Sequence, residues 1–421
     1  MRRLKVLVSA FACSPHGESG LGTGEDILGW NIIQQIGRFH EVWVLASRLN
    51  ESGIEKALQE IPQPRLHFEY FNLPRCFHRF LNRSRGGIQW YAYFWQLRAF
   101  FKARALHRKI RFDLFHHVTY ANDWMASFIG ALLPVPFVRG PGGGTHPVPQ
   151  IFLKSDSFIR QVWEHIRILG RWVFRLDPVF ILGQSRAKAL LLCNQEAREA
   201  VEKRWRHKVY LFPVNGVSEE DLSLLKRVDF EKKRSQRTFR VLSAGRWIPL
   251  KGFSLAIKAF QEFHQRHPRS EFTIYGEGPD EVFLKELVQA LHVGDCLHLR
   301  PWIPRKRVLE EMMSCDVFLF PSLYDGGGFV IVEAMAAGLP VVCLESGGPG
   351  FHIRPEWGIK IEPKNPDSVV SELAKAMEKL AEDADLRIRL GRAAQKRVEE
   401  FYVWDRLGEH LQRIYEEVLP F

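Results

Sequence analysis

The stretch from Val317 to Gly338, VFLFPSLYDGGGFVIVEAMAAG, decides the fold of this chain. It opens on four apolar residues, as a buried strand does, and passes through three consecutive glycines into a helical pattern that begins near Phe329. Consecutive glycines let a ligand approach the backbone closely, and a helix N-terminus behind them favours negative charge. The stretch therefore predicts a strand, loop and helix of an α/β protein, with an anion site at the loop.

Short apolar runs alternate with helical patterns on both sides of this stretch. Strands are predicted at Lys5–Ala10, Glu41–Ala46, Leu114–His117, Pro136–Arg139, Arg240–Ala244, Glu271–Tyr275, Cys296–Arg300, Val317–Phe320 and Val341–Leu344. Helices are predicted at Ile27–Ile36, Ser254–His267, Asp280–His292, Arg305–Ser314, Phe329–Ala337 and Asp405–Val418. Strands that alternate with helices imply parallel sheets covered on both faces. The sequence therefore predicts two similar α/β halves.

The length of 421 residues exceeds what one hydrophobic core usually supports, so we expect two domains. The stretch between the halves carries Pro213, Asn215-Gly216 and a run of mixed charge, which are typical of a linker. We predict an N-terminal domain over residues 1–205, a linker over 206–238 and a C-terminal domain over 239–400. A last helical segment over 401–421 completes the chain.

The net charge of +11 favours an anionic partner, which is a phosphorylated substrate, an acidic membrane or a nucleic acid. The six cysteines include no CxxC pair, which indicates reduced thiols in a cytosolic protein. The longest uncharged apolar stretch, Trp124 to Val138, is too short to span a bilayer. We therefore expect a cytoplasmic protein whose only membrane association would be peripheral, at the inner face.

Residues 70–112 form a basic segment that contains no acidic residue. Its ten cationic residues are Arg75, Arg79, Arg83, Arg85, Arg98, Lys102, Arg104, Arg108, Lys109 and Arg111, and aromatic residues lie between them. One interpretation is a surface that binds anionic lipid headgroups. The other, given equal weight, is a pair of packed helices with a solvated basic face. Nucleic acid is disfavoured because no nucleic-acid-binding module accompanies the charge.

Two cations follow the strand that ends at Ala244. Gly245-Arg246 lies directly after it, and Lys251 lies five residues beyond the arginine. Each cation that meets a phosphate makes charge-assisted hydrogen bonds of about 1.5–3 kcal/mol. A solvated surface pair is the plainer alternative, because this spacing alone is common. At the triple-glycine loop, Asp325 and Glu333 would bind sugar and ribose hydroxyls, although Glu333 could also act only on the helix dipole.

The segment from Ser322 to Val342 resembles the E-x7-E signature of glycosyltransferase family 4, also called glycosyltransferase group 1. Asp325 and Glu333 have its spacing, with Asp at the first position and Gly327 where an aromatic is common. The resemblance implies that the first acid contacts the donor sugar, the second the nucleotide ribose, and Arg246 with Lys251 the diphosphate. Two further landmarks match, namely Gly276-Glu277-Gly278-Pro279 and Trp302-Ile303-Pro304, whose backbone faces the base in the family.

The first half also resembles this family. The matching segments are the glycine loop Gly20-Leu21-Gly22-Thr23-Gly24-Glu25, the strand end with His116-His117, and Gly140-Pro141-Gly142-Gly143-Gly144. A histidine pair at a strand end is more often structural than catalytic, but here either ring could reach the donor sugar. Strand alternation would turn only one of them towards the ligand. The glycine loop lacks the dinucleotide fingerprint, since Glu25 stands where its last glycine belongs.

The resemblance implies a GT-B fold, in which two Rossmann-like domains face a cleft and the last helix crosses back to the first domain. It implies transfer of a hexose, with retention and without a metal, from a UDP- or GDP-linked sugar to a saccharide or lipid-linked saccharide. The predicted catalytic residues are Arg246, Lys251, Asp325, His116 and His117. The predicted donor-binding residues are Gly20, Gly22, Gly245, Gly276, Trp302, Ile303, Gly326, Gly327, Gly328, Phe329, Val330 and Glu333.

Two other functions stay open from the sequence. A protein with the same fold could be an epimerase or a phosphorylase, or it could bind a nucleotide sugar without catalysis. No cofactor, metal or nucleic acid is expected beside the nucleotide sugar.

Overall fold

The computed structural model describes residues 2–77, 87–143, 148, 150–153, 158–235 and 238–419. These residues divide into two compact units. The first unit comprises the described residues within 1–145, 164–214 and 404–421, and the second those within 146–163 and 215–403. The change between Val214 and Asn215 lies inside the predicted linker. The last helix belongs to the first unit although it follows the second in sequence.

The first unit is built on a parallel sheet of seven strands in the order β3-β2-β1-β4-β5-β6-β7. The strands are β1 (Lys5–Ser9), β2 (Glu41–Ser47), β3 (Leu66–Phe71), β4 (Leu114–His117), β5 (Phe137–Gly142), β6 (Ala187–Leu192) and β7 (Val209–Leu211). The order reverses between β1 and β4. In a doubly wound sheet, ligands bind outside the carboxyl ends of the strands at such a reversal.

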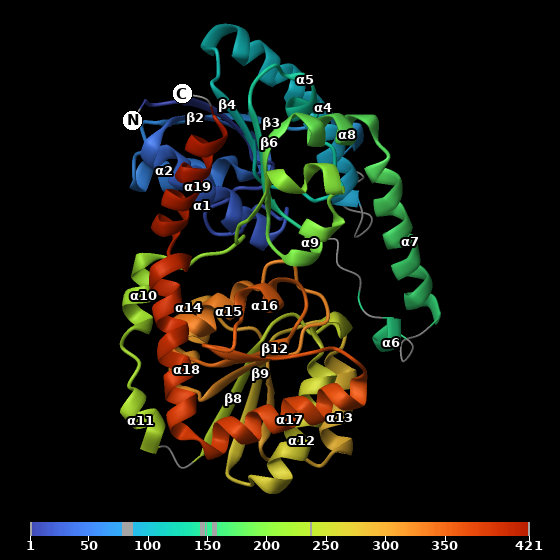
Figure 1. The fold of residues 1–421 in the computed structure, drawn as a ribbon, viewed down its shortest axis with the longest axis vertical. Helices are drawn as coiled ribbons and strands as arrows, with labels where there is room; N and C mark the ends of the chain where they lie inside the picture. Colours follow the sequence, from blue (N-terminus) through green and yellow to red (C-terminus); the bar gives the residue numbers. More distant parts are fainter. Residues whose placement is uncertain are drawn as a thin grey trace. The chain divides into compact units, whose positions relative to one another are not determined.

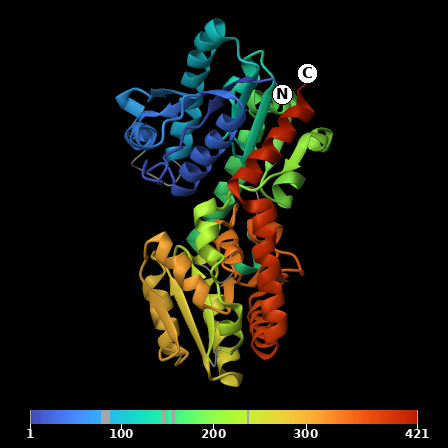
Figure 2. The same cartoon turned by 90° about the vertical axis from the view of Figure 1, so that its left-hand side faces the viewer.

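Helices cover this sheet, and the last helix of the chain is one of them (Figures 1 and 2). They include α1 (Thr23–Phe39), α2 (Glu51–Glu60), α4 (Gly87–Ile110), α5 (Phe128–Leu132), α8 (Pro178–Arg186), α9 (Gln195–Ala200) and α19 (Trp404–Val418), together with most of α7 (Phe158–Arg175). The helix predicted at Asp405–Val418 is confirmed as α19, and its Leu407, Leu411 and Ile414 are buried. Helix α19 packs on α1, where Gln35 Nε2 donates to Asp405 Oδ1 at 3.2 Å.

The second unit is built on a parallel sheet of six strands in the order β10-β9-β8-β11-β12-β13. The strands are β8 (Phe239–Ala244), β9 (Ser270–Tyr275), β10 (Leu297–Arg300), β11 (Val317–Phe320), β12 (Val341–Leu344) and β13 (Gly358–Ile361). Its helices are α6 (Gln150–Leu153), α10 (Glu219–Leu225), α11 (Phe230–Ser235), α12 (Phe253–Arg266), α13 (Glu281–Ala290), α14 (Arg305–Ser314), α15 (Phe329–Ala336), α16 (Gly347–His352), α17 (Pro366–Glu382) and α18 (Ala384–Arg397).

Strand β11 shows why this sheet needs helices on both faces. Val317 and Leu319 belong to one buried cluster, whereas Phe318 and Phe320 belong to another on the opposite face. Side chains of a strand alternate between faces, so a continuous apolar run must be covered twice. The order reverses between β8 and β11, which brings the loops after these two strands together. The predicted α/β architecture with parallel sheets is confirmed.

The basic segment contributes a packed helix to the first unit. Tyr91 and Trp95 of α4 are fully buried, whereas Arg104 and Arg108 are exposed. This agrees with the packing interpretation for α4, while lipid binding stays a prediction. Arg79, Arg83 and Arg85 of the segment, and Gly144 of the predicted glycine segment, lie outside the described residues.

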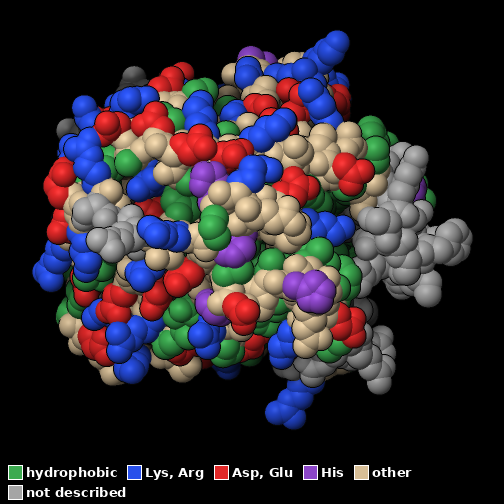
Figure 3. Space-filling view, turned by 90° about the horizontal axis from the view of Figure 1, so that it is seen from below, with side chains coloured by type: hydrophobic (Ala, Val, Ile, Leu, Met, Phe, Trp, Pro, Cys, Tyr) green, Lys and Arg blue, Asp and Glu red, His purple; other side chains and the backbone are tan. Residues whose placement is uncertain are grey.

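Across the described ranges, no helix has both the length and the apolar content that crossing a bilayer requires. The face drawn in Figure 3 mixes Lys and Arg with Asp and Glu side chains, so the positive net charge of the chain is not gathered on that face.

Candidate functional site

The loops after β8 and β11 are joined by backbone hydrogen bonds at the reversal of strand order. The carbonyl oxygen of Leu250 accepts from the amides of Leu323 at 2.9 Å and Tyr324 at 3.2 Å. Gly252 has φ of +68°, and a Cβ there would lie 2.0 Å from the carbonyl oxygen of Pro321. Only glycine fits this crossing. The two loops that the sequence analysis assigned to one anion site therefore do lie together.

Lys251 and Asp325 link these loops by an ion pair between Nζ and Oδ2. Their side chains are only 17% and 14% exposed. The other carboxylate oxygen of Asp325 accepts from the amides of Gly327 at 3.1 Å and Gly328 at 2.7 Å. Burial alone would raise the pKa of Asp325, but the Lys251 charge and the two amides outweigh it and hold the pKa below its usual value. The Asp325 carboxylate thus binds the lysine and the glycine amides that were predicted to bind a phosphate.

The triple-glycine turn is held from behind by His352. The Nε2 atom of His352 lies 2.7 Å from the carbonyl oxygen of Gly327, and its Nδ1 lies 2.9 Å from the hydroxyl of Tyr402. A carbonyl oxygen can only accept, so Nε2 carries the proton and Nδ1 accepts from the tyrosine. Burial lowers the pKa of His352 to about 4, so the ring is neutral at neutral pH. Neither residue was predicted from the sequence.

Two further groups fix the backbone of the same turn. The side-chain amide of Asn215 donates to the carbonyl oxygens of Gly328 at 3.2 Å and Phe329 at 3.3 Å. The amide of Gly348 donates to the carbonyl oxygen of Asp325 at 2.8 Å. With its carbonyls bound on one side, the turn presents the amides of Gly327 and Gly328 to the Asp325 carboxylate. Such fixed amides are what an anion site at a helix N-terminus requires.

Glu333 has a partner that the sequence analysis missed. Its Oε1 lies 2.5 Å from Nε of Arg305, and Nη1 of Arg305 lies 2.8 Å from Oδ2 of Asp221. Burial raises the pKa of Glu333, and the Arg305 charge opposes that rise without cancelling it. Glu333 is therefore oriented by a cation and does more than face the helix dipole. Its predicted contact with the ribose stays a prediction.

The other predicted residues of the second unit include members of the loops after β8, β9 and β10. A Cβ on Gly276 would lie 2.0 Å from the carbonyl oxygen of Gly245, so the loop after β9 passes directly against the loop after β8. Trp302, which follows β10, is 55% exposed, and Ile303 is partly buried against the core. Arg246 is exposed, and its place in the phosphate clamp stays a prediction.

The glycine loop of the first unit lies between β1 and α1. Gly20 and Gly22 have φ of +74° and +123°, which other residues rarely adopt. Behind them, a carboxylate oxygen of Glu25 accepts from the amide of Tyr120 at 3.0 Å. Burial raises the pKa of Glu25 to about 7. A carboxyl group with a pKa near neutrality beside a glycine loop is a candidate proton-transfer group, a role that the sequence analysis did not assign to Glu25.

His116 and His117 are both fully buried within the first unit. His116 binds the hydroxyl of Tyr415 through Nδ1 and the carbonyl oxygen of Gly140 through Nε2, each at 2.6 Å. The Nε2 atom of His117 lies 3.0 Å from the side-chain amide of Gln96. Burial lowers their pKa values to about 4 and about 3. Both rings are buried in the first unit, and the expectation that one of them reaches the donor sugar stays a prediction.

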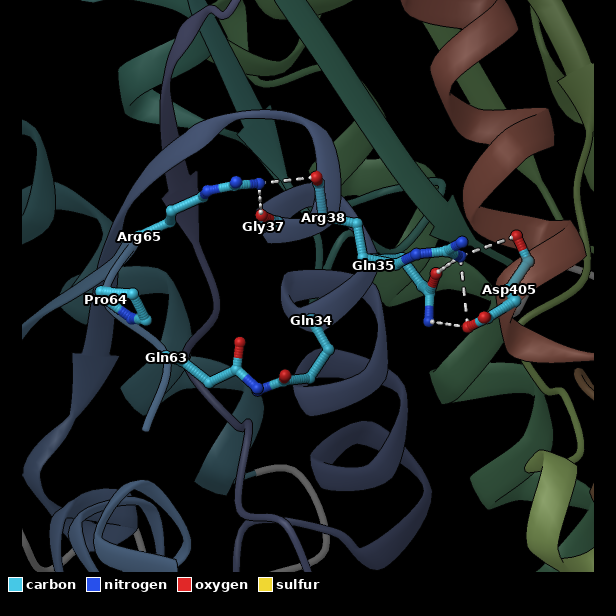
Figure 4. Close-up of a pocket in the computed structure, with 8 residues that line it drawn as sticks. All are labelled: Gln34, Gln35, Gly37, Arg38, Gln63, Pro64, Arg65 and Asp405. Atoms are coloured by element: carbon cyan, nitrogen blue, oxygen red, sulfur yellow. Dashed lines mark hydrogen bonds and ion pairs between the residues drawn. The ribbon is translucent and has the colours of Figure 1, made fainter. Parts of the chain in front are cut away.

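A surface pocket of the first unit has no predicted site residue in its lining (Figure 4). Its volume is about 440 Å³, and its lining residues are Gln34, Gln35, Gly37, Arg38, Gln63, Pro64, Arg65 and Asp405. The two arginines are already engaged. Arg65 donates to the carbonyl oxygen of Arg38 at 2.8 Å, and Arg38 pairs with Asp405 at 3.2 Å. The pocket therefore offers little charge to a ligand.

One group of potential metal ligands was found among the described residues. Single ligand atoms of His267, Glu378 and Glu382 lie within 4.8 Å of one another. His267 precedes β9, so this group lies at the opposite end of the strands from the glycine turn. Glu378 is also paired with Arg266 at 2.9 Å. The group is therefore remote from the loops that carry the predicted chemistry.

Comparison with known proteins shows what the second unit is similar to. Residues 226–397 match the family model described as Glycosyl transferases group 1. An uncharacterized glycosyltransferase of Methanocaldococcus jannaschii is 25% identical over 76% of this chain and 80% of its own length. A D-inositol 3-phosphate glycosyltransferase of Corynebacterium jeikeium is 29% identical over 44% of this chain. The matched segment spans only 45% of that protein.

Solved structures show that the fold is GT-B. Sucrose-phosphate synthase from Thermosynechococcus elongatus superposes with a TM-score of 0.64 at 17% identity, covering 99% of both chains. A glycosyltransferase from Rickettsia africae gives 0.63 at 13% identity, covering 100% of this chain and 99% of that one. Anabaena HepE in complex with UDP gives 0.60 at 15% identity, covering 98% and 100%. At these identities the likeness concerns the fold alone.

Proposed function

We propose that this chain is a retaining, metal-independent hexosyltransferase. Its donor is a UDP- or GDP-linked sugar, and its acceptor is a hydroxyl of a saccharide or lipid-linked saccharide. One observation carries the proposal: the Lys251 ammonium and the amides of Gly327 and Gly328 converge on a single carboxylate. One cation and two amide hydrogen-bond donors meet one anion at the reversal of strand order. Such a site fits a phosphate.

Relatives support the class of donor. The Corynebacterium glutamicum protein that is 28% identical over 41% of this chain is named as a GDP-mannose-dependent mannosyltransferase. The Anabaena protein was solved with UDP. The choice between uridine and guanosine would depend on the segment around Trp302 and Ile303.

The proposed reaction is described by the bonds that break and form and by the negative charge that develops on the leaving diphosphate. The bond between the anomeric carbon and the phosphate oxygen breaks, and the acceptor oxygen forms a bond to the same carbon. The acceptor proton passes to the departing phosphate, so atoms and charge balance. Negative charge then grows on the diphosphate, where Lys251 and the two glycine amides stabilise it. Such preorganised groups are often the largest contribution to catalysis. Arg246 would bind the second phosphate.

Asp325 must leave the amides before a phosphate can occupy them. Its carboxylate would then accept from hydroxyls of the donor sugar, as the resemblance implies. Glu333, held by Arg305, would bind the ribose hydroxyls. Within the first unit, the histidine pair would fix the strand ends.

The test compares two lysines of the second unit. Lys251→Ala should lower turnover by about 10²–10³, since it removes one group that stabilises the leaving group. Lys285→Ala is the control, because Lys285 is exposed on α13 and pairs with Glu281 of the same helix. Transfer by Lys251→Ala within threefold of wild type would reject the proposal. Product analysis separates transfer from epimerisation or phosphorolysis, and a protein that binds donors without any transfer or hydrolysis would be a non-catalytic binder.

Metal independence has its own measurement. Activity should survive chelation by EDTA, because the cationic groups named above take the place of a metal ion at the diphosphate. A loss of activity that added Mg²⁺ or Mn²⁺ restores would contradict this part of the proposal.

A further inference from the structure

Three side chains of the second unit, which we call the His-Glu cluster, lie where two packed helices end. The cluster consists of His267, Glu378 and Glu382. Helix α12 ends at Arg266, directly before the histidine, and α17 ends at Glu382. The two helices pack side by side (Figure 1). Because the C-terminus of a helix carries partial negative charge, both helix ends favour a cation at this place.

The imidazole of the cluster lies between two carboxylate oxygens. Nε2 of His267 lies 3.6 Å from Oε1 of Glu378 and 3.8 Å from Oε1 of Glu382. Both distances exceed the roughly 2.7–3.2 Å of an N–H···O hydrogen bond. Zn²⁺, with bonds of about 2.0–2.2 Å, holds tetrahedral ligands about 3.3–3.6 Å apart. The two carboxylate oxygens lie within 4.8 Å of each other, and rotation of the exposed Glu382 side chain can close that gap.

The histidine ring and Glu378 are fixed by their surroundings. The ring of His267 stacks on that of the fully buried Phe263, with the centroids 4.9 Å apart. The carbonyl oxygen of His267 accepts from the Ser270 hydroxyl at 2.7 Å. Oε1 of Glu378 accepts from Nε of Arg266 at 2.9 Å. A carboxylate oxygen has two lone pairs, so this oxygen can bind an ion with one while the arginine orients it through the other.

The kinds of ligand in the cluster favour zinc among the common divalent cations. Imidazole with carboxylates suits Zn²⁺, whereas Mg²⁺ and Ca²⁺ prefer ligand sets made of oxygen. A pocket of about 360 Å³ adjoins His267 and leaves room for a water as the fourth ligand. Arg387 also lines this pocket, but it is paired with the buried Asp316 at 3.2 Å, so its charge is balanced.

We propose that the His-Glu cluster binds Zn²⁺ and thereby ties the end of α12 to the end of α17. Three protein ligands and one water would complete a tetrahedral site. The sequence analysis expected no metal, because the histidine and the glutamates are more than a hundred residues apart. The ion would be structural, since the cluster lies at the opposite end of the strands from the glycine turn. The inference is therefore independent of the proposed transfer reaction.

The experiment is calorimetric titration of the chelator-treated full chain with ZnCl₂. Wild type should bind one Zn²⁺ per chain, and zinc should raise the melting temperature, as any ion that binds only the native state does. Glu382→Gln should weaken zinc binding at least about tenfold, because it removes a ligand and keeps the size of the side chain. Glu382 is 64% exposed, so without zinc this variant should melt as wild type does.

The matched control is Glu372→Gln on the same helix. Glu372 is 51% exposed and pairs with Lys375, so its loss should leave zinc binding unchanged. No zinc binding by wild type, the same affinity in Glu382→Gln as in wild type, or equal losses in both glutamine variants would overturn the proposal. So would binding of Mg²⁺ or Ca²⁺ as tight as that of Zn²⁺.

A second comparison separates this proposal from the proposed activity. Lys251→Ala should bind zinc as wild type does, even though it should lose turnover. Glu382→Gln should transfer sugar as wild type does, with or without zinc, because the cluster is remote from the glycine turn. If Lys251→Ala lost zinc binding, the assignment of the ion to the His-Glu cluster would be wrong.

Discussion

Each unit of the chain contains a buried histidine held between a tyrosine and a glycine carbonyl. In the first unit, His116 binds the Tyr415 hydroxyl and the carbonyl oxygen of Gly140. In the second, His352 binds the Tyr402 hydroxyl and the carbonyl oxygen of Gly327. Burial lowers the pKa of both histidines to about 4. The same side-chain arrangement therefore occurs twice, with the same tautomer in each case.

The two arrangements differ in the backbone segment to which the glycine belongs. Gly140 belongs to strand β5, where the histidine holds the backbone near the end of the strand. Gly327 belongs to the turn whose amides bind the Asp325 carboxylate. A buried histidine with both nitrogens bonded is thus a positioning group, and its value for function depends on which backbone it holds. The sequence motifs pointed to His116 and did not single out His352.

The largest expected effect is a difference in activity between variants of His352 and variants of His116. His352→Ala should lower turnover by about 10²-fold, because the Gly327 carbonyl loses its donor and the turn amides lose their alignment. His116→Ala should leave the affinity for nucleotide sugar within about threefold of wild type, although both changes should destabilise the protein. The measurements are steady-state kcat and KM, with His352→Gln as the conservative variant that should recover part of kcat. Equal losses of kcat in both alanine variants would contradict the distinction.

The second prediction concerns the pH dependence of stability. A histidine with a pKa near 4 in the folded state and about 6.5 when unfolded binds no proton in the folded state between these values, whereas the unfolded chain does. The free energy of unfolding should therefore fall as the pH drops from 6.5 towards 4, by at most about 3 kcal/mol for each histidine.

Calorimetry at pH 7 and pH 5 tests this prediction. The drop in melting temperature between the two pH values should be smaller in His116→Asn and in His352→Asn than in wild type. If one variant keeps the whole wild-type drop, the corresponding histidine is not held neutral, and the two arrangements are not equivalent.

The smallest expected effect concerns the tyrosines. Tyr402→Phe and Tyr415→Phe each remove the hydrogen bond to Nδ1 and should each cost about 1–3 kcal/mol of stability, since a buried acceptor loses its donor. Only Tyr402→Phe should also lower turnover, by about tenfold or less, because only its histidine supports the glycine turn. Denaturant unfolding gives the stability and initial rates give the turnover. A larger loss of turnover in Tyr415→Phe would invert the comparison.

The sequence predicted the central strands better than the edges. Val317–Phe320 and Leu114–His117 agree with β11 and β4 at both ends, because buried parallel strands read as continuous apolar runs. Strands β3, β6, β7 and β13 were not predicted. Strand β7 has only three residues, and β6 contains Ala and Lys, which favour helices as much as strands. Such short or mixed segments become strands only because a neighbouring strand pairs with them.

The candidate site was predictable where it consists of a local motif. The glycine turn, Lys251 and Asp325 follow from spacing along the chain, and the structure brings these three together. The supporting groups could not be found this way, because their partners are distant in sequence. Tyr402 lies 50 residues from His352, and Asn215 lies more than a hundred from the turn it binds. Arg305 directly follows the landmark Trp302-Ile303-Pro304, but nothing in the sequence indicates that it contacts Glu333.

The ion pair between Lys251 and Asp325 has a consequence for selectivity. Any anion that enters must displace a carboxylate already bound to the ammonium and two amides, so the affinity for small free anions is reduced by the free energy of that exchange. A whole donor recovers this cost through contacts made by its sugar, ribose and base, whereas orthophosphate has none of them. The Asp325 carboxylate thus competes with an incoming anion for the same groups, which favours large phosphorylated ligands over small ones.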